Sequence, residues 1–186
     1  MNEKDLSIKD TLSNIVFITG GTKSGKSEFA EHLAKETKKL SYIALSEKNI
    51  DDKEWQKKIN IHRKRRPKDC ESIETTDLLN TLRQEDGPLL IDSIGGFVME
   101  SIEKEHKEWS IKMSSLISLL IKIKSKTFIV GEQVGWSLVS EYKIGNTYIE
   151  RIGELQKRIT KISKDNWLAI NGRAIKIDDI SLEIPS

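Results

Sequence analysis

Residues 20–27 read Gly-Gly-Thr-Lys-Ser-Gly-Lys-Ser, and their types and spacing define the clearest chemistry in the sequence. Glycines let the backbone approach an anion and turn its N–H groups inward. Lys26 is placed to reach the β- and γ-oxygens of a nucleoside triphosphate, and the Ser27 hydroxyl can bind Mg²⁺. The sequence therefore predicts a phosphate-binding loop whose triphosphate contacts are Gly20, Gly21, Thr22, Lys23, Ser24, Gly25, Lys26 and Ser27.

A second candidate group is Asp92, which ends the apolar run Leu-Leu-Ile-Asp at 89–92. An aspartate at the carboxyl end of a neighbouring parallel strand can hold Mg²⁺ directly or through water. Asp92 is therefore expected to share the metal with Ser27. The alternative is that Asp92 caps the turn that follows it.

A third candidate is the basic segment 62–68, His-Arg-Lys-Arg-Arg-Pro-Lys, which follows a polar, helix-forming stretch. It has three interpretations. It could be a solvated helix end favoured by the helix dipole. It could bind nucleic acid, although it lacks interleaved aromatic residues and the net charge of the chain is only +2. Or it could surround a phosphate, with His62 as acid, base or nucleophile.

The elements that must position these groups alternate between strands and helices. Strands are predicted at 14–19, 40–45, 72–74, 89–92 and 127–130, and a hairpin at 167–170 and 174–177. Helices are predicted from Ser27 onward and over 51–65, 77–84, 108–124 and 146–164. Alternation of this kind predicts an α/β fold with a mainly parallel sheet flanked by helices. In the first helix, Phe29, Ala30, Leu33 and Ala34 form the predicted apolar face, and Glu28, Glu31, Lys35 and Glu36 the polar one.

Composition limits the class of protein. The 186 residues suit one compact domain, with a flexible arm at 1–13 and a single nucleotide-binding domain of the P-loop (RecA-like) type at 14–186. Cys70 is the only cysteine, which excludes an internal disulfide and a cysteine-based zinc site. The charged N-terminus does not resemble a secretory signal, and no apolar segment is long enough for a membrane span. We expect a cytoplasmic protein without a nucleic-acid partner.

Several segments together resemble one family, the bifunctional adenosylcobinamide kinase / adenosylcobinamide-phosphate guanylyltransferases. The resemblance covers nearly the whole chain after residue 14, and its most specific piece is Ile-x-x-His-Arg-x-x-Arg-Pro at 59–67. The other matching pieces are 17–31 around the phosphate loop, Tyr-Ile-Ala at 42–44, Asp51-Asp52, Ile-Glu-Thr at 73–75, Leu-Leu-Ile-Asp-Ser at 89–93, Val-Gly-Trp at 134–136, Val139, Glu141 and Gly153.

The resemblance implies two linked activities on a corrinoid substrate. One transfers a γ-phosphate from ATP or GTP to the aminopropanol hydroxyl of adenosylcobinamide. The other transfers GMP from GTP to the resulting phosphate, through a guanylyl-histidine that falls on His62 here. The resemblance also implies a homo-oligomer, a trimer in the family. Beyond the phosphate loop, the nucleotide contacts that it implies are Ala44, Leu45, Ser46, Arg63, Lys64, Arg65, Arg66, Glu74 and Asp92.

The chain departs from the family where the corrinoid is expected. The family usually reads Asn-Glu-Val-Gly-x-Gly-Ile-Val-Pro-Glu, whereas residues 132–141 read Glu-Gln-Val-Gly-Trp-Ser-Leu-Val-Ser-Glu, so Gln133 replaces the usual acid. The helix that follows carries Asn146, Glu150 and Gln156-Lys157 where the family usually has Arg, Asp and Asn-Gln. Three alternatives stay open: a member with only one of the activities, a kinase for another alcohol, and a non-catalytic nucleotide-binding switch.

Overall fold

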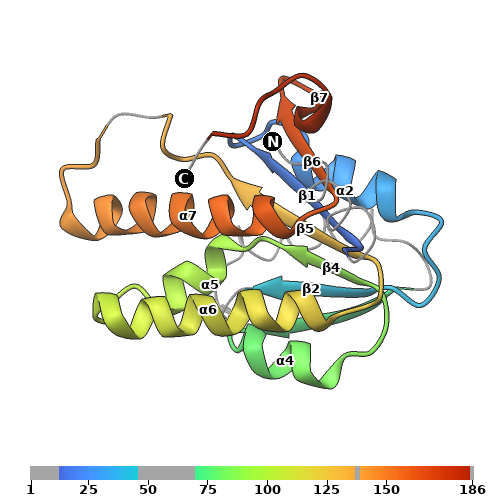
Figure 1. Ribbon diagram of the computed structural model, residues 1–186, viewed down its shortest axis with the longest axis horizontal. Helices are drawn as coiled ribbons and strands as arrows, with labels where there is room; N and C mark the ends of the chain where they lie inside the picture. Colours follow the sequence, from blue (N-terminus) through green and yellow to red (C-terminus); the bar gives the residue numbers. More distant parts are fainter. Residues whose placement is uncertain (1–12, 46–69, 137–138, 185–186) are drawn as a thin grey trace, which may run out of the picture.

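The protein is built around one seven-stranded sheet (Figure 1). The computed structural model describes residues 13–45, 70–136 and 139–184. The strands run in the order β3-β2-β4-β5-β1-β6-β7. Their bounds are β1 Ile15–Gly20, β2 Ser41–Leu45, β3 Glu71–Thr75, β4 Leu89–Asp92, β5 Thr127–Glu132, β6 Asp165–Ile170 and β7 Arg173–Lys176.

Five helices and a single 3₁₀ turn accompany the sheet in the described ranges. Their bounds are α2 Lys26–Ala34, α4 Leu78–Gln84, α5 Gly95–Glu100, α6 His106–Lys122, α7 Lys143–Ile162 and η1 Ile177–Asp179. In Figure 1, α4, α5, α6 and α7 lie together on one side, and α2 lies apart from them beside β1.

The two faces of the sheet each form a hydrophobic core, because side chains alternate along a strand. In β1, Ile15 and Phe17 pack with the buried side chains of α4, α5, α6 and α7. Val16 and Ile18 point the other way and pack with Ala30 and the rest of the apolar face of α2. All six residues of β1 are buried, which explains why this strand reads as a continuous apolar run.

The predicted fold class is confirmed. Every strand pair is parallel except β6 with β7, which forms the antiparallel hairpin expected around 171–173. Asn171 and Gly172 both have positive φ, 50° and 73°, as a two-residue type I′ turn requires. The phosphate loop leaves β1 near the middle of the sheet, between β5 and β6. The loop is therefore flanked by the carboxyl ends of neighbouring parallel strands.

Two expectations about helices were wrong. The sequence predicted no helix directly after Asp92, but α5 begins at Gly95; its two leading glycines disfavour a helix by propensity alone. At Gly96 a Cβ atom would collide with the carbonyl of Leu45, so packing against β2 requires glycine there. In α2, Glu31 was expected on the solvated face but is only 7% exposed. The predicted helix at 51–65 lies outside the described residues.

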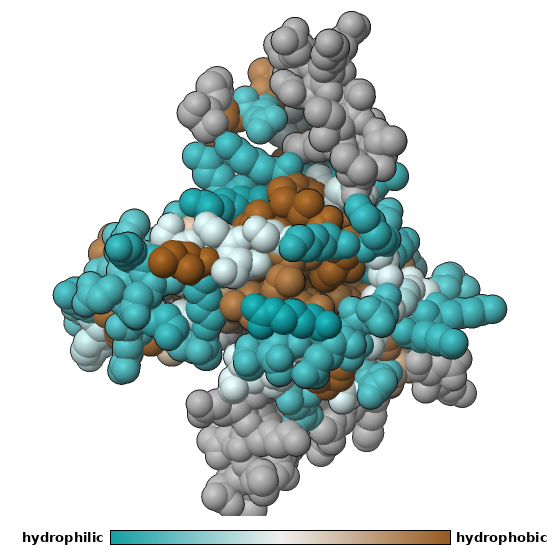
Figure 2. Space-filling model, turned by 60° about the horizontal axis from the view of Figure 1, so that its bottom comes forward, coloured by the Kyte–Doolittle hydropathy of each residue, from teal (hydrophilic) through white to brown (hydrophobic). Residues whose placement is uncertain are grey.

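The helical side of the molecule is shown in Figure 2, turned so that the part bearing α4 and α6 comes forward. Hydrophobic surface gathers near its centre within a hydrophilic surround. Exposed apolar side chains of this layer include Met99, Ile111 and Ile121. None of the helices described is long and apolar enough to cross a membrane.

Candidate active site

The phosphate loop turns sharply between β1 and α2. Lys23 and Gly25 have positive φ, 55° and 95°, and Gly25 is the N-cap of α2. The Phe29 N–H donates to the Gly25 carbonyl at 2.9 Å, so the helix starts directly at the loop. The Lys26 ammonium lies over its own loop and donates to the Gly21 carbonyl at 3.2 Å. The structure thus brings a lysine, a helix N-terminus and a backbone concavity together, a combination suited to phosphate groups.

The tip of the β6–β7 hairpin braces this loop from the side. The Gly172 N–H donates to the Ser24 carbonyl at 3.0 Å. Gly20 is also tightly packed. A Cβ atom there would lie 2.6 Å from Ser24 Oγ and would collide with the Ala169 carbonyl. The sequence predicted the hairpin, but nothing in its local pattern indicated that the tip would contact the phosphate loop.

We expect Gly172→Pro to weaken triphosphate binding by roughly tenfold, because proline removes the donor to Ser24 and cannot adopt a φ of 73°. Gly172→Asn is the matched control: asparagine tolerates positive φ, keeps the N–H and meets no atom within 4 Å of its Cβ. Calorimetric titration with GTP and ATP measures both. Equal affinities in two folded variants would show that the hairpin contact does not shape the loop.

Beside the loop, Asp92 links three elements. Ser27 Oγ donates to Asp92 Oδ1 at 3.1 Å, and the Tyr42 hydroxyl donates to Asp92 Oδ2. Asp92 therefore faces the loop serine, as the metal hypothesis requires. Neighbouring hydroxyl and carboxylate oxygens are ligands that suit Mg²⁺. Within 13–45, 70–136 and 139–184, no group of three or more His, Cys, Asp or Glu is arranged so that it could hold a metal ion.

Glu132 is the functional candidate that the sequence reasoning missed. It ends β5 and pairs in register with Gly20, the first residue of the loop. Its Oε1 accepts from the Ser93 hydroxyl, and its Oε2 accepts from the Gly95 N–H at 3.1 Å. Burial raises the pKa of the Glu132 carboxyl from its ordinary 4.5 to about 7, while the positive charge of Lys26 acts in the opposite direction.

Glu132 has three further neighbours, Gly95, Tyr148 and Gln156. A Cβ atom at Gly95 would collide with the Tyr148 hydroxyl and lie 2.8 Å from Glu132 Oε2, so one of these side chains would have to move. Burial, and then the charge of Glu132, raises the pKa of Tyr148. Gln156, from the part of the chain that departs from the family pattern, is buried; it accepts from Thr19 Oγ1 at 2.8 Å and donates to the Glu132 carbonyl at 3.0 Å.

The replacement of the usual acid by Gln133 therefore does not leave this end of β5 without a carboxylate. The Gln133 N–H donates to the Gly20 carbonyl at 2.9 Å, which ties the chain after β5 to the phosphate loop. The signal available in the sequence was an acidic residue at the end of a buried, mainly apolar strand, as with Asp92.

The other predicted nucleotide contacts follow the same edge of the sheet. Ala44 pairs in register with Asp92 on one side and with Glu74 on the other, and Leu45 is the next residue of β2. From β1 to β3 the edge spans four strand spacings, roughly 19 Å. Glu74 is therefore too far from the loop to contact the same phosphate group. Ser46, His62 and Arg63, Lys64, Arg65 and Arg66 lie outside the described residues.

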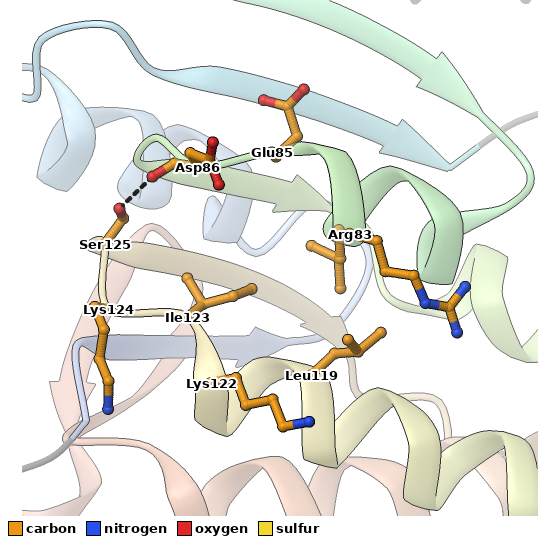
Figure 3. A pocket seen from close by; sticks show the side chains of 9 residues that line it. Arg83, Glu85, Asp86, Leu119, Lys122, Ile123, Lys124 and Ser125 are labelled. Atoms are coloured by element: carbon orange, nitrogen blue, oxygen red, sulfur yellow. Dashed lines mark hydrogen bonds between the residues drawn. The ribbon is translucent and has the colours of Figure 1, made fainter.

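A shallow hollow of about 320 Å³ lies elsewhere, between the end of α4 and the end of α6 (Figure 3). Its lining includes Arg83, Asp86, Lys122 and Ser125, and the Ser125 hydroxyl donates to the Asp86 carbonyl at 2.8 Å. Asp86 precedes β4 and Ser125 precedes β5, so the hollow is at the amino ends of strands whose carboxyl ends face the phosphate loop. It is separate from the candidate site.

Comparison with solved structures agrees with this architecture. The ATPase EscN of the enteropathogenic E. coli type III secretion system, solved assembled with its central stalk EscO, superposes with a TM-score of 0.53 at 12% identity. The match covers 84% of this chain and 42% of the ATPase chain, so this protein spans less than half of that neighbour. Identity at this level shows a shared fold.

Sequence comparison identifies relatives with higher identity to this chain. The bifunctional adenosylcobalamin biosynthesis protein CobU of Escherichia coli K12 is 26% identical over 88% of this chain and 99% of its own length. The protein of the same name from Salmonella typhimurium is 25% identical over the same shares, and the CobP protein of Pseudomonas aeruginosa is 28% identical over 77% of this chain and 86% of its own.

The family described as cobinamide kinase / cobinamide phosphate guanyltransferase matches residues 16–177, from the strand that leads into the phosphate loop to the end of the hairpin that braces it. The matched range includes Lys26, Ser27, Asp92 and Glu132. Because this match covers most of the chain, the chain belongs to the cobinamide kinase / cobinamide phosphate guanyltransferase family.

Proposed function

We propose that this protein phosphorylates adenosylcobinamide with ATP or GTP and then transfers GMP from GTP to the phosphate, in the assembly of the cobalamin nucleotide loop. The observation that carries the proposal is the family match over 16–177, which includes an intact phosphate loop facing Asp92. The relatives are adenosylcobalamin biosynthesis proteins, and the geometry of the loop supports triphosphate binding.

In the phosphoryl-transfer step, the residues of this chain mainly hold and orient the nucleotide. The N–H groups of the loop and the start of α2 bind the phosphates, and Lys26 moves from the Gly21 carbonyl to the β- and γ-oxygens. Ser27 and Asp92 present adjacent oxygens that fit Mg²⁺. When bound, that ion would neutralise phosphate charge.

In the guanylyl-transfer step, His62 is the proposed nucleophile. A neutral imidazole attacks phosphorus well and titrates near neutral pH. The adjacent Arg63, Lys64, Arg65 and Arg66 would stabilise phosphate charge and disfavour the imidazolium. The guanine nucleotide of this step would then bind along the sheet edge, apart from the triphosphate in the loop. Its proposed contacts are Ala44, Leu45, Ser46 and Glu74. We further propose, from the resemblance, that the protein acts as a homo-oligomer.

Purified protein incubated with adenosylcobinamide, ATP and GTP tests the proposal. Mass spectrometry should detect adenosylcobinamide phosphate with ATP alone and adenosylcobinamide-GDP when GTP is added. Product from only one step would identify a member with a single activity. Tight nucleotide binding without either product, or phosphorylation of a different alcohol only, would contradict the proposal.

The metal assignment gives a prediction about Mg²⁺ dependence. We expect Ser27→Ala and Asp92→Asn each to lower phosphoryl transfer by roughly tenfold or more and to raise the Mg²⁺ concentration needed for half-maximal rate, because each removes an oxygen beside the metal. Tyr42→Phe is the control, since it breaks a bond to Asp92 without removing an oxygen that faces the loop. Titration of the rate with Mg²⁺ is the measurement. An Asp92→Asn protein with a wild-type Mg²⁺ profile would remove Asp92 from the metal site.

A further inference from the structure

Glu132 lies beside the phosphate loop but is not one of the groups proposed to bind phosphate or metal. It pairs with Gly20 across β1 and β5, at the same edge as Asp92 on β4. Its carboxylate is fixed by two donors, Ser93 Oγ and the Gly95 N–H. Each carboxylate oxygen has two lone pairs, so both can accept one more proton or hydrogen bond.

We propose that Glu132 is the general base of phosphoryl transfer and accepts the proton of the acceptor hydroxyl. As the hydroxyl oxygen forms its bond to the γ-phosphorus, its proton moves to a Glu132 oxygen. The bond from the γ-phosphorus to the β,γ-bridging oxygen breaks, and the nucleoside diphosphate leaves with that electron pair. Glu132 then releases its proton to water. The inference rests on the proposed kinase activity, and it assigns the general base that the phosphate loop does not provide.

The surroundings suit this role. Lys26 comes from α2, Asp92 from β4 and Tyr148 from α7, and these are the ionisable groups whose charges act on Glu132 or are acted on by it. Burial makes the carboxylate more basic than an exposed glutamate, which matches a base that works near neutral pH. The positive charge of Lys26 acts against that shift. Ser93 and Gly95 orient it without occupying all its acceptor positions.

The two activities provide an internal control, because only one acceptor carries a proton that must be removed. The alcohol of adenosylcobinamide must lose its proton as it attacks. Adenosylcobinamide phosphate already attacks as an oxyanion and needs no base. Glu132→Gln keeps the shape and the acceptor oxygen of the side chain but cannot take up a proton. Glu103→Gln, at an exposed glutamate beyond the end of α5, is the matched control.

In Glu132→Gln we expect kcat for adenosylcobinamide phosphorylation to fall by roughly a hundredfold or more, with little change in KM for ATP. The acidic limb of the wild-type pH–rate profile, expected near pH 7 from the raised pKa of Glu132, should disappear. GMP transfer to adenosylcobinamide phosphate supplied ready-made should continue near the wild-type rate. Glu103→Gln should match the wild type in both assays.

Three results would overturn the inference. One is a Glu132→Gln protein that phosphorylates adenosylcobinamide at the wild-type rate. Another is equal loss of both activities, which would show a structural role, and the third is a deficit that excess Mg²⁺ restores, which would show a role in holding the metal. A wild-type protein that phosphorylates no adenosylcobinamide would instead refute the proposed function on which the inference rests.

Discussion

His62→Ala is expected to eliminate GMP transfer while leaving most of the phosphorylation of adenosylcobinamide. If His62 attacks the α-phosphorus of GTP, removal of its imidazole removes the covalent intermediate, and pyrophosphate release from GTP should stop. Transfer of the γ-phosphate from a nucleotide bound in the phosphate loop needs no such intermediate. The expected loss is at least roughly a thousandfold, the scale seen when a nucleophile that acts as part of a catalytic unit is removed.

The experiment uses GTP labelled at the α-phosphate, followed by peptide mapping by mass spectrometry. Acid-labile label should appear on the peptide that contains His62 and be absent from the variant. His32→Ala and His106→Ala are the controls, since both histidines are exposed, on α2 and at the start of α6. GMP found on His32, on His106 or on no residue, together with a wild-type rate in His62→Ala, would rule out the assignment.

Lys26→Ala is expected to reduce affinity for ATP and GTP by roughly a hundredfold or more and to abolish phosphorylation. The ammonium of Lys26 lies at the loop, where it donates to the Gly21 carbonyl. Hydrogen bonds from a charged donor to phosphate are worth roughly 1.5–3 kcal/mol each, so losing them costs two or more powers of ten in affinity.

Calorimetry with Mg²⁺ and either nucleotide measures the effect. Lys35→Ala is the matched control, because Lys35 is an exposed lysine at the C-cap of the same helix. Circular dichroism should show that both variants are folded. Unchanged affinity in a folded Lys26→Ala protein would mean that the triphosphate binds elsewhere.

Local sequence patterns were sufficient for most of the fold. The β-branched run of β1, the apolar stripe of α7 and the Asn171-Gly172 turn each follow from interactions between residues close in the chain. The phosphate loop can be predicted for the same reason, because its glycines, Lys26 and Ser27 lie close together in the chain. α5 was missed because Gly96 is dictated by the close approach of the Leu45 backbone, which is distant in sequence.

What the sequence by itself determined is therefore the family, the α/β class and the triphosphate loop. Only the tertiary structure decided which distant side chains meet that loop. Asp92 faces Ser27 across 65 positions of the chain, and Glu132 lies beside Gly20 because β5 inserts between β1 and β4. The physical reason is that parallel strands bring their carboxyl ends to one edge, but the order in which they pair depends on packing of the whole sheet.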